Sequence, residues 1–351
     1  MDFDFSEEEQ AISDLTRQIF EDKVTHEHLR ALENSANYFD KDLWGSLAET
    51  GIVGASVHEE YGGAGLSFLS ITALLELVGE FAARVPAMET IIAGALPIQE
   101  FGTDTQRNQL LPKIVTGEII ATSALINTSE ISIQDKKLSG SCDFISFGLE
   151  ADVLLVPSED SVFVVMADAA GLTKSAQVTT TGHPQASITL ENVEAEQLGE
   201  ITAEEFLAWL RLRIDSAICS IMAGACEASL NLASDYTKIR QQFDRAIATF
   251  QAVSQRAGDA YIDTEAVRLT SRQAAWRISA NKIAAREVAI ARWWASEAGF
   301  RVVHASTHLH GGVGVDRDYP LHRYFLMARQ LELTLGNSEE QLEKIGNLLS
   351  M

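Results

Sequence analysis

The order of its hydrophobic periodicities limits what this chain can fold into more than any other feature. From Ser6 to about Gly117, apolar residues recur at helical spacing. From about Ile119 to Val193 the pattern changes to short β-type runs, and from about Thr202 long helical patterns return. We therefore predict an α+β fold with three domains: an N-terminal α-helical domain over residues 1-118, a middle antiparallel β domain over 119-197 and a C-terminal α-helical bundle over 198-351.

Local signals support this division. Ser6 and Glu9 have the spacing of a capping box, which predicts the start of the first helix. Three apolar runs between turn residues predict strands, namely Val153–Val156, Val162–Met166 and Ser187–Leu190. Unbroken helical patterns predict long helices up to Tyr236, over Gln251–Ile278 and over Lys282–Thr307.

The charge balance excludes several classes of function. Asp and Glu number 50 against 27 Lys and Arg, which gives a net charge of -23. Such a surface repels phosphate backbones and anionic membranes, so we expect neither nucleic acid nor a membrane as a partner. No apolar run reaches the length that spans a bilayer, and the acidic first ten residues lack the apolar core of a secretory signal. We therefore expect a cytoplasmic location.

The cysteines agree with a reducing compartment. The chain has three, Cys142, Cys219 and Cys226, which do not make a disulfide framework. Cys219 and Cys226 lie seven residues apart on one face of a helical stretch. We expect them to be buried thiols.

The stretch from Tyr236 to Gln251 carries a candidate anion-binding group. The guanidinium of Arg240 is a planar fork that suits the paired oxygens of a pyrophosphate. Phe243 offers a flat apolar face three residues later. Taken alone, Arg240 could equally form a surface ion pair with an acidic neighbour.

Two glycine-containing stretches accompany it. Residues 308–323 include Gly311, Gly312 and Gly314, where the missing Cβ lets backbone N–H groups approach a phosphate or ribose. A second glycine-rich stretch, Glu59–Gly65, lies in the N-terminal part. Neither stretch has the third glycine and the βαβ context of a Rossmann fingerprint.

Together these stretches resemble motifs of the acyl-CoA dehydrogenases and cover essentially the whole chain. Residues 236–251 are similar to "Y-x-x-x-R-x-x-F-G-x-x-I-x-x-F-Q" of that family, and residues 308–323 to "Q-x-H-G-G-x-G-x-x-x-x-Y-P-x-x-R". The resemblance implies a helical N-terminal domain, a β-barrel-like middle domain and a C-terminal four-helix bundle. It also implies FAD as cofactor and α,β-desaturation of an acyl-CoA thioester, with electrons passed to an acceptor.

The same resemblance implies which residues contact the FAD of a neighbouring subunit. His308 departs from the pattern, because glutamine is usual there, yet a neutral imidazole still donates one hydrogen bond. The implied cofactor-binding residues are Arg240, Gln242, Phe243, Gln251, His308, Gly311, Gly312 and Gly314.

Both positions that carry the catalytic glutamate in this family are aliphatic here. The usual position, before a glycine on the helix after the Y-P-x-x-R motif, corresponds to Leu335. The alternative position on the long helix corresponds to Ala217, and Asp215 lies two residues away on a different helical face. Neither Leu335 nor Ala217 accepts a proton, so we expect no catalytic residue in this chain. Glu332 is the nearby carboxylate that could substitute.

The middle part of the sequence also lacks residues that the family uses near the flavin. The family's flavin-approaching "T-E-P-x-x-G-S-D" stretch corresponds to about Ala121–Glu130, which lacks the glycine and the Ser-Asp pair. The family's "W-I-T" flavin contact corresponds to Phe144–Ser146. The chain therefore resembles most the non-catalytic subunit of the heterotetrameric (α2β2) acyl-CoA dehydrogenases that desaturate steroid side-chain CoA thioesters. The resemblance implies a catalytic partner subunit and a shared FAD.

Two other readings stay open at this point. One is a self-sufficient homotetrameric dehydrogenase in which Glu332 acts as the base. The other is a non-enzymatic protein that binds acyl-CoA or serves as a scaffold. A metal site on His304 and His308, four residues apart, lacks further ligands in the sequence, so we expect no metal.

Overall fold

The computed structural model describes residues 6–35, 38–126, 131–158 and 160–350. These residues form two compact units. The first contains Met1–Ala31, Phe68–Ala83 and Asp215–Met351, and the second contains Leu32–Ser67 and Arg84–Ile214. Helices α2 (His26–Asn34) and α7 (Ala203–Ile239) contribute residues to both units. The boundaries of the three predicted domains stay a prediction.

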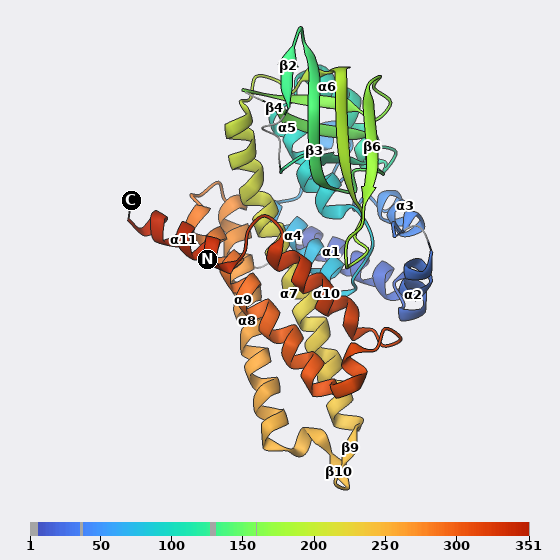
Figure 1. Ribbon diagram of the computed structural model, residues 1–351, viewed down its shortest axis with the longest axis vertical. Coiled ribbons are helices and arrows are strands. Elements are labelled where there is room, and N and C mark those ends of the chain that lie inside the picture. The colour runs from blue at the N-terminus through green and yellow to red at the C-terminus, as the bar shows by residue number, and fades with distance from the viewer. Residues whose placement is uncertain (1–5, 36–37, 127–130, 159, 351) are drawn as a thin grey trace. The chain divides into compact units, whose positions relative to one another are not determined.

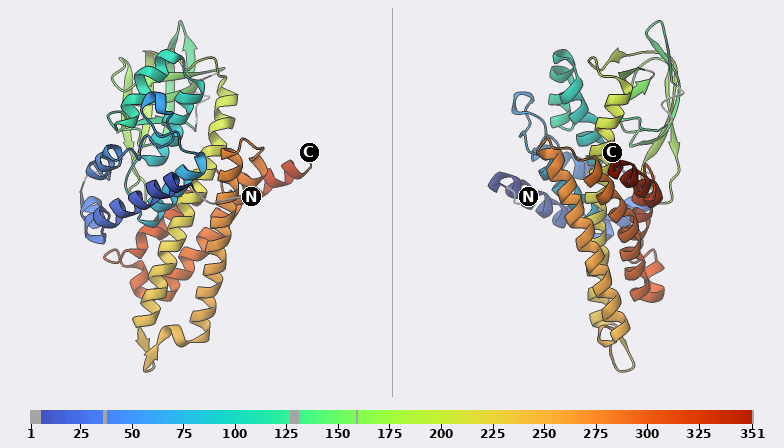
Figure 2. Two further views of the ribbon diagram at one scale, coloured as in Figure 1. Left: turned by 180° about the vertical axis from the view of Figure 1, so that it is seen from behind. Right: turned by 90° about the vertical axis from the view of Figure 1, so that its left-hand side faces the viewer.

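The first unit is built from helices. Figure 1 shows its long C-terminal helices side by side, and both views of Figure 2 show the β9–β10 hairpin at the far end of α7 and α8. Besides parts of α2 and α7, its elements are α1 (Glu7–Lys23), α4 (Phe68–Glu80), β9 (Gln241–Gln242), β10 (Arg245–Ala246), η4 (Ile247–Thr249), α8 (Gln251–Ser279), α9 (Ala285–His310), η5 (Gly311–Val315), α10 (Leu321–Leu333) and α11 (Ser338–Leu349).

Two glycines let α4 and α7 touch backbone to backbone. A Cβ added at Gly79 of α4 would lie 1.9 Å from the carbonyl oxygen of Ile221 in α7. In the opposite direction, a Cβ added at Gly224 of α7 would lie 1.8 Å from the carbonyl oxygen of Glu76 in α4. No side chain fits at either position, so the helices can pack this closely only with glycine at both.

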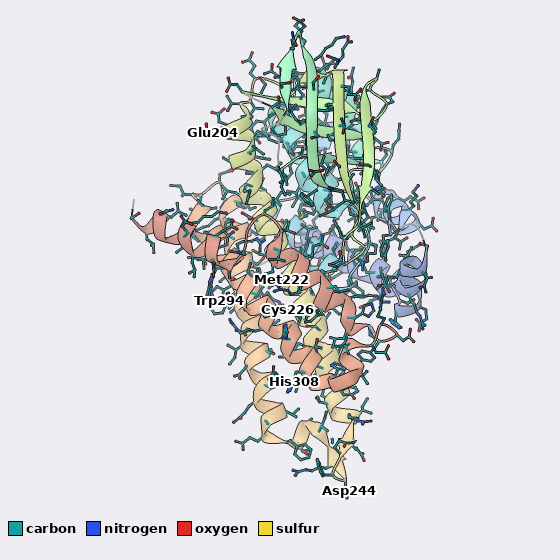
Figure 3. The ribbon with its side chains drawn as sticks, in the orientation of Figure 1. Glu204, Met222, Cys226, Asp244, Trp294 and His308 are labelled. Carbon is teal, nitrogen blue, oxygen red and sulfur yellow. The ribbon has the colours of Figure 1, made fainter. Side chains whose placement is uncertain are left out.

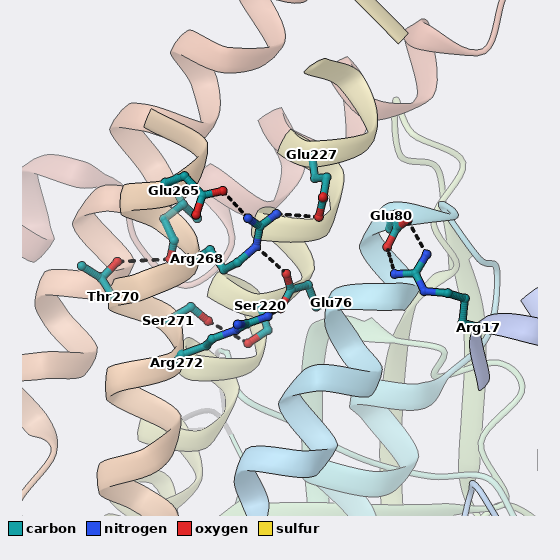
Figure 4. Close-up of polar contacts among 11 residues, drawn as sticks. Arg17, Glu76, Glu80, Ser220, Glu227, Glu265, Arg268, Thr270, Ser271 and Arg272 are labelled. Atoms are coloured by element: carbon teal, nitrogen blue, oxygen red, sulfur yellow. Dashed lines mark hydrogen bonds and ion pairs between the residues drawn. The ribbon is translucent and has the colours of Figure 1, made fainter. Parts of the chain in front are cut away.

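A charged network ties the same helices to α8 (Figure 4). The Arg268 guanidinium of α8 donates to Glu76 of α4 at 2.9 Å and to Glu227 of α7 at 2.5 Å, and it also pairs with Glu265. Burial lowers the pKa of Arg268, but the carboxylates outweigh burial and raise the pKa above its ordinary value. The network therefore keeps a partly buried arginine charged and fixes three helices to one another.

The second unit contains two four-stranded sheets. Their orders are β1-β4-β5-β8 and β2-β3-β7-β6. The strands are β1 (Ala121–Ser123), β2 (Ser132–Gln134), β3 (Lys137–Ser146), β4 (Val153–Ser158), β5 (Ser161–Met166), β6 (Leu172–Gln177), β7 (Gln185–Glu194) and β8 (Glu196–Gln197). The helices are α3 (Lys41–Glu49), η1 (Glu59–Tyr61), η2 (Met88–Ala95), α5 (Leu96–Phe101) and α6 (Asp104–Val115), with the first turns of α7.

The predicted architecture of helical, sheet and helical parts is confirmed, with one difference inside the sheets. All three predicted strands lie within β4, β5 and β7. Strand β1, however, pairs with β4 in parallel, whereas the other ladders within the described residues are antiparallel. The β2–β3 hairpin lies between β1 and β4 in the sequence, and this long connection lets β4 return in the direction of β1.

Burial explains the most apolar helix and the cysteines. Helix α7 is long and apolar enough to cross a membrane, although the sequence analysis expected no such run. Within the protein, 78% of its most apolar window is buried, as in the core helix of a globular protein. Cys219 and Cys226 lie on this helix and are buried thiols, as predicted, and Cys142 is buried as well.

Candidate functional site

The Arg240 segment forms the turn between α7 and α8. The chain leaves α7 at Ile239, makes the short β9–β10 hairpin and enters α8 at Gln251. The two residues of the hairpin turn, Phe243 and Asp244, have φ of 55° and 62°. Positive φ at both central residues is typical of two-residue hairpin turns, whose twist matches the strands. Figure 3 shows Asp244 at the far end of this unit.

The predicted ligand groups of this segment face solvent. Among the residues that the structure describes, Arg240 makes no ion pair and no side-chain hydrogen bond, and it is exposed. Phe243 is 88% exposed, and its ring contacts that of Phe250 edge to face at 6.1 Å. The Arg245 guanidinium lies 4.1 Å from the Phe250 ring centroid, a contact that the sequence analysis missed.

Two glutamines complete this segment. Gln242 is exposed, and its amide nitrogen donates to the Gln241 carbonyl at 2.8 Å. Gln251 is exposed in the first turn of α8. Phe250, the N-cap of α8, provides no side-chain cap, although the Val253 N–H of that first turn donates to the Phe250 carbonyl oxygen at 3.0 Å.

The second predicted segment follows the end of α9. His308 and the next two glycines, Gly311 and Gly312, are exposed. Gly311 has φ of 62°, and a Cβ added at Gly311 or Gly312 would meet no atom within 4 Å. Gly314 differs, because it is buried and an added Cβ would lie 2.6 Å from the carbonyl oxygen of Thr307. Packing alone therefore requires glycine at 314, while the first two glycines leave open backbone.

An aromatic stack joins the two segments. The ring of Tyr236, one turn before Arg240, stacks on the ring of His310 with centroids 4.5 Å apart. His310 Nδ1 donates to the carbonyl oxygen of Ser306 at 2.8 Å, and Nε2 accepts from the Tyr319 hydroxyl at 3.1 Å. Burial lowers the pKa of His310, and the bond to Ser306 opposes that shift. The geometry fits a neutral imidazole.

Both positions at which the family resemblance predicts a catalytic base carry buried aliphatic side chains. Ala217 is fully buried in α7, and Leu335 is 8% exposed. Leu335 has φ of 59°, a left-handed conformation that a leucine seldom adopts. Neither side chain carries a group that takes up a proton.

The carboxylates near these positions are held in ion pairs. Asp215 accepts from Nε of the fully buried Arg292 at 3.4 Å. The same guanidinium donates to the carbonyl oxygens of Leu331 at 2.8 Å and of Gly336 at 3.4 Å. Glu332 pairs with Arg329 one turn earlier in α10. Each carboxylate therefore has an arginine partner in its own helical unit.

The second unit contains a polar cluster that no sequence pattern predicted. Ser146 Oγ lies 2.5 Å from Glu89 Oε1 and 2.5 Å from His183 Nε2, and Glu89 is 4% exposed. Phe144, two residues earlier, is 53% exposed, and Ile145 is buried. Glu89 sits in the apolar helix η2, far from Ser146 in the sequence, so no local signal could have found the cluster. Residues 127–130, the end of the altered "T-E-P-x-x-G-S-D" stretch, lie outside the described residues.

Other candidates have structural explanations. A Cβ added at Gly63 of the Glu59–Gly65 loop would lie 2.0 Å from the carbonyl oxygen of Val57, so backbone packing accounts for this glycine. The His304 ring packs against Phe300 and Phe325 at 4.1 and 5.1 Å. In the described ranges no group of three His, Cys, Asp or Glu side chains is placed to hold a metal ion.

Comparison with known proteins gives matches along the whole chain. The model "Acyl-CoA dehydrogenase, N-terminal domain" matches residues 6–118, and "Acyl-CoA dehydrogenase, C-terminal domain" matches residues 201–349. The acyl-CoA dehydrogenase FadE27 of Mycobacterium tuberculosis is 35% identical over all of this chain and 99% of its own length.

Solved structures of this family have a fold similar to that of this chain. One subunit of the ChsE4-ChsE5 complex from Mycobacterium tuberculosis has a TM-score of 0.93 at 35% identity, with 100% of this chain and 99% of that one covered. A chain of the Tcur3481-Tcur3483 steroid ACAD has a TM-score of 0.90 at 36% identity, with 98% of each chain covered. Butyryl-CoA dehydrogenase from Megasphaera elsdenii has a TM-score of 0.91 at 25% identity, with both chains fully covered.

Proposed function

Because this chain belongs to the acyl-CoA dehydrogenase family, we propose that it is the non-catalytic subunit of a hetero-oligomeric FAD-dependent acyl-CoA dehydrogenase. A catalytic partner subunit supplies the base and the cradle of the flavin ring. This chain supplies the Arg240 segment and the Gly311–Gly312 backbone to the nucleotide part of that FAD.

The single observation that carries the proposal is a contrast within one unit. Among the described residues, the Arg240 guanidinium is exposed without an ion pair or hydrogen bond, and Gly311 and Gly312 expose backbone that no Cβ covers, whereas the base positions Ala217 and Leu335 are buried and aliphatic. A free guanidinium, exposed glycine backbone and an uncapped helix start suit a pyrophosphate. A positioned base contributes about 10²–10⁴-fold in rate, and this chain has none at either position.

The residues fit FAD by the chemistry of their donors. Arg240 would pair with the pyrophosphate, the Phe243 ring would cover an apolar part of the nucleotide, and Gln251 and His308 would donate hydrogen bonds. FAD, when bound, accepts the hydride of the desaturation. The part of this chain is to bind and orient the nucleotide, since its own carboxylates near the base positions are held by Arg292 and Arg329.

The proposed substrate class and partner are inferred from the relatives. Two relatives with about the same identity are described as a complex of two different chains, one of them as a steroid ACAD. We propose the same division of labour here, with a bulky CoA thioester such as a steroid side-chain ester as substrate. Electrons then pass to a separate acceptor protein.

Co-expression with a candidate catalytic acyl-CoA dehydrogenase subunit tests the proposal. We expect the purified complex to hold less than one FAD per chain and to oxidise acyl-CoA, while the isolated chain does neither. Arg240→Ala should lower the FAD content of the complex by weakening FAD binding about tenfold or more, since a charge-assisted bond is lost. Arg286→Ala, which removes an exposed arginine of α9 outside the site, is the control.

Several outcomes would reject the proposal. Full FAD loading and turnover by the isolated chain, abolished by Glu332→Gln, would instead support a self-sufficient enzyme. Acyl-CoA binding without flavin, alone or with a partner, would support a scaffold. FAD content that Arg240→Ala leaves unchanged would show that Arg240 does not bind the cofactor.

A further inference from the structure

We propose that His310 is a positioning residue, which as a neutral imidazole holds the Arg240 segment and the Gly311–Gly312 backbone in the arrangement that one bound nucleotide requires. This inference rests on the proposed function, because it concerns the same site. His310 itself is 3% exposed and does not contact the nucleotide. It acts through the two segments on either side of it.

The backbone connections make this role direct. The backbone N–H of Arg240 donates to the Tyr236 carbonyl oxygen at 2.8 Å, so Arg240 follows Tyr236 within one helical turn. On the other side, Gly311 is the next residue after His310 and bonds through its N–H to the carbonyl of His308. The 4.5 Å stack of Tyr236 on His310 therefore links one ligand segment to the other through a single pair of rings.

Both nitrogens of His310 are used, and they fix its orientation. The Ser306 carbonyl can only accept, so Nδ1 carries the proton and Nε2 is left to accept from Tyr319. The Tyr319 ring lies 5.0 Å from His310 and 6.5 Å from Tyr236, which closes the cluster on a third side. A leucine or phenylalanine at 310 could fill the space but could not keep the ring in this orientation.

The ionisation of His310 decides whether the arrangement holds. The titratable groups that face it are Tyr236 of α7 and Tyr319 of the connection to α10. Asp235 of α7 acts on Tyr319 and pairs with Lys238 at 3.2 Å, so no described contact gives His310 a carboxylate partner. Protonation would place a second proton on Nε2, where Tyr319 now donates, and would leave an uncompensated charge in a buried site.

Release of FAD from the complex with the catalytic subunit tests this inference. The rate is measured by the rise of flavin fluorescence after dilution, at pH 7.5 and at pH 5.5. His310→Phe keeps a ring but removes both nitrogens, and Tyr319→Phe removes only the hydroxyl. His304→Phe is the matched control, because His304 lies on the same helix outside the stack.

At pH 7.5 we expect His310→Phe to release FAD about tenfold faster than the unaltered complex, the size expected from one lost hydrogen bond and a displaced ring. Tyr319→Phe should show a smaller increase, and His304→Phe none. The unaltered complex should release FAD faster at pH 5.5 than at pH 7.5, and His310→Phe should lose that difference. If His310 only filled space, His310→Phe would leave the pH dependence of FAD release unchanged.

The outcomes separate the two proposals. If Arg240→Ala releases FAD rapidly while His310→Phe and Tyr319→Phe behave as the unaltered complex, the positioning role is wrong and the proposed function stands. If Arg240→Ala also has no effect, the proposed function itself fails. A pH dependence that persists in His310→Phe would assign it to the exposed His308 and would overturn the neutral-imidazole role. Should His310→Phe fail to assemble, Tyr319→Phe still tests the positioning role at pH 7.5, where an FAD release rate equal to that of the unaltered complex would overturn it.

Discussion

At the scale of single residues, two positions combine a non-glycine side chain with a backbone conformation that favours glycine. Leu335 and Asp244 both have positive φ, a region that suits glycine and costs other residues about 1 kcal/mol. Asp244 stands where the family motif has glycine, in a two-residue turn at the end of the Arg240 segment. Leu335, the position at which we expected the family's base, lies beside the carbonyl groups of Leu331 and Gly336 that Arg292 binds.

The turn residue gives a direct prediction. Asp244→Gly should raise the free energy of unfolding by about 0.5–1 kcal/mol, because glycine adopts positive φ without steric cost. Chemical denaturation of the isolated chain measures the change. Asp259→Gly, an exposed aspartate inside α8, should do the opposite by a few tenths of a kcal/mol, since glycine is unfavourable in a helix interior. Equal effects at the two positions would contradict the conformational explanation.

At the scale of elements, the close contact of α4 with α7 shapes the helical unit. Gly79 and Gly224 let two backbones meet, and the Arg268 network then binds α4, α7 and α8 together. The same α7 carries Ala217 in its buried part and leads into the Arg240 segment at its end. Tight packing in the interior of the helix and an exposed turn after its C-terminal end thus belong to one continuous segment.

This contact predicts a large effect of one added methyl group. Gly224→Ala should destabilise the chain by about 1–3 kcal/mol or more, because the new Cβ meets the Glu76 backbone and neither helix can yield cheaply. The midpoint of thermal unfolding is the measurement. Gly258→Ala is the matched control, since α8 leaves open space around Gly258 and alanine should add about 1 kcal/mol there. A neutral Gly224→Ala would show that α4 and α7 do not touch as described.

At the scale of the whole molecule, the acidic side chains and the apolar core occupy different regions. The excess of carboxylates, -23 in net charge, lies mostly at the surface, while α7 supplies the apolar core of the helical unit. Cys219 and Cys226 are fully buried on α7, and burial raises the pKa of each thiol to about 12. Their reactivity therefore reports whether the core is intact.

Thiol labelling follows from this burial. At pH 8 the native chain should take up almost no alkylating reagent at Cys219 or Cys226, because the reactive thiolate is suppressed at a pH far below 12. In denaturant both thiols should react fast, since their pKa values return to the ordinary range. Mass spectrometry of labelled peptides distinguishes the two states. Rapid native labelling of either cysteine would contradict a closed α7 core.

The printed sequence was enough to predict the order of helical and sheet parts, the approximate limits of the long C-terminal helices and the segments that resemble family motifs. Periodicity is a local property, so the long helices and strands β4, β5 and β7 could be predicted from it. That Ala217 and Leu335 occupy the positions of the catalytic base is inferred from residue type and stays a prediction. That Arg240 binds a shared FAD stays a prediction.

Which distant side chains meet could be read only from the folded chain. Glu89 and Ser146, Asp215 and Arg292, and Tyr236 and His310 are separated by dozens of residues, and no local pattern pairs them. The parallel pairing of β1 with β4 likewise depends on a non-local ladder. Exposure likewise depends on the folded chain. Arg240 is exposed because the turn that carries it extends beyond the helices packed around α7. No local sequence pattern predicts that exposure.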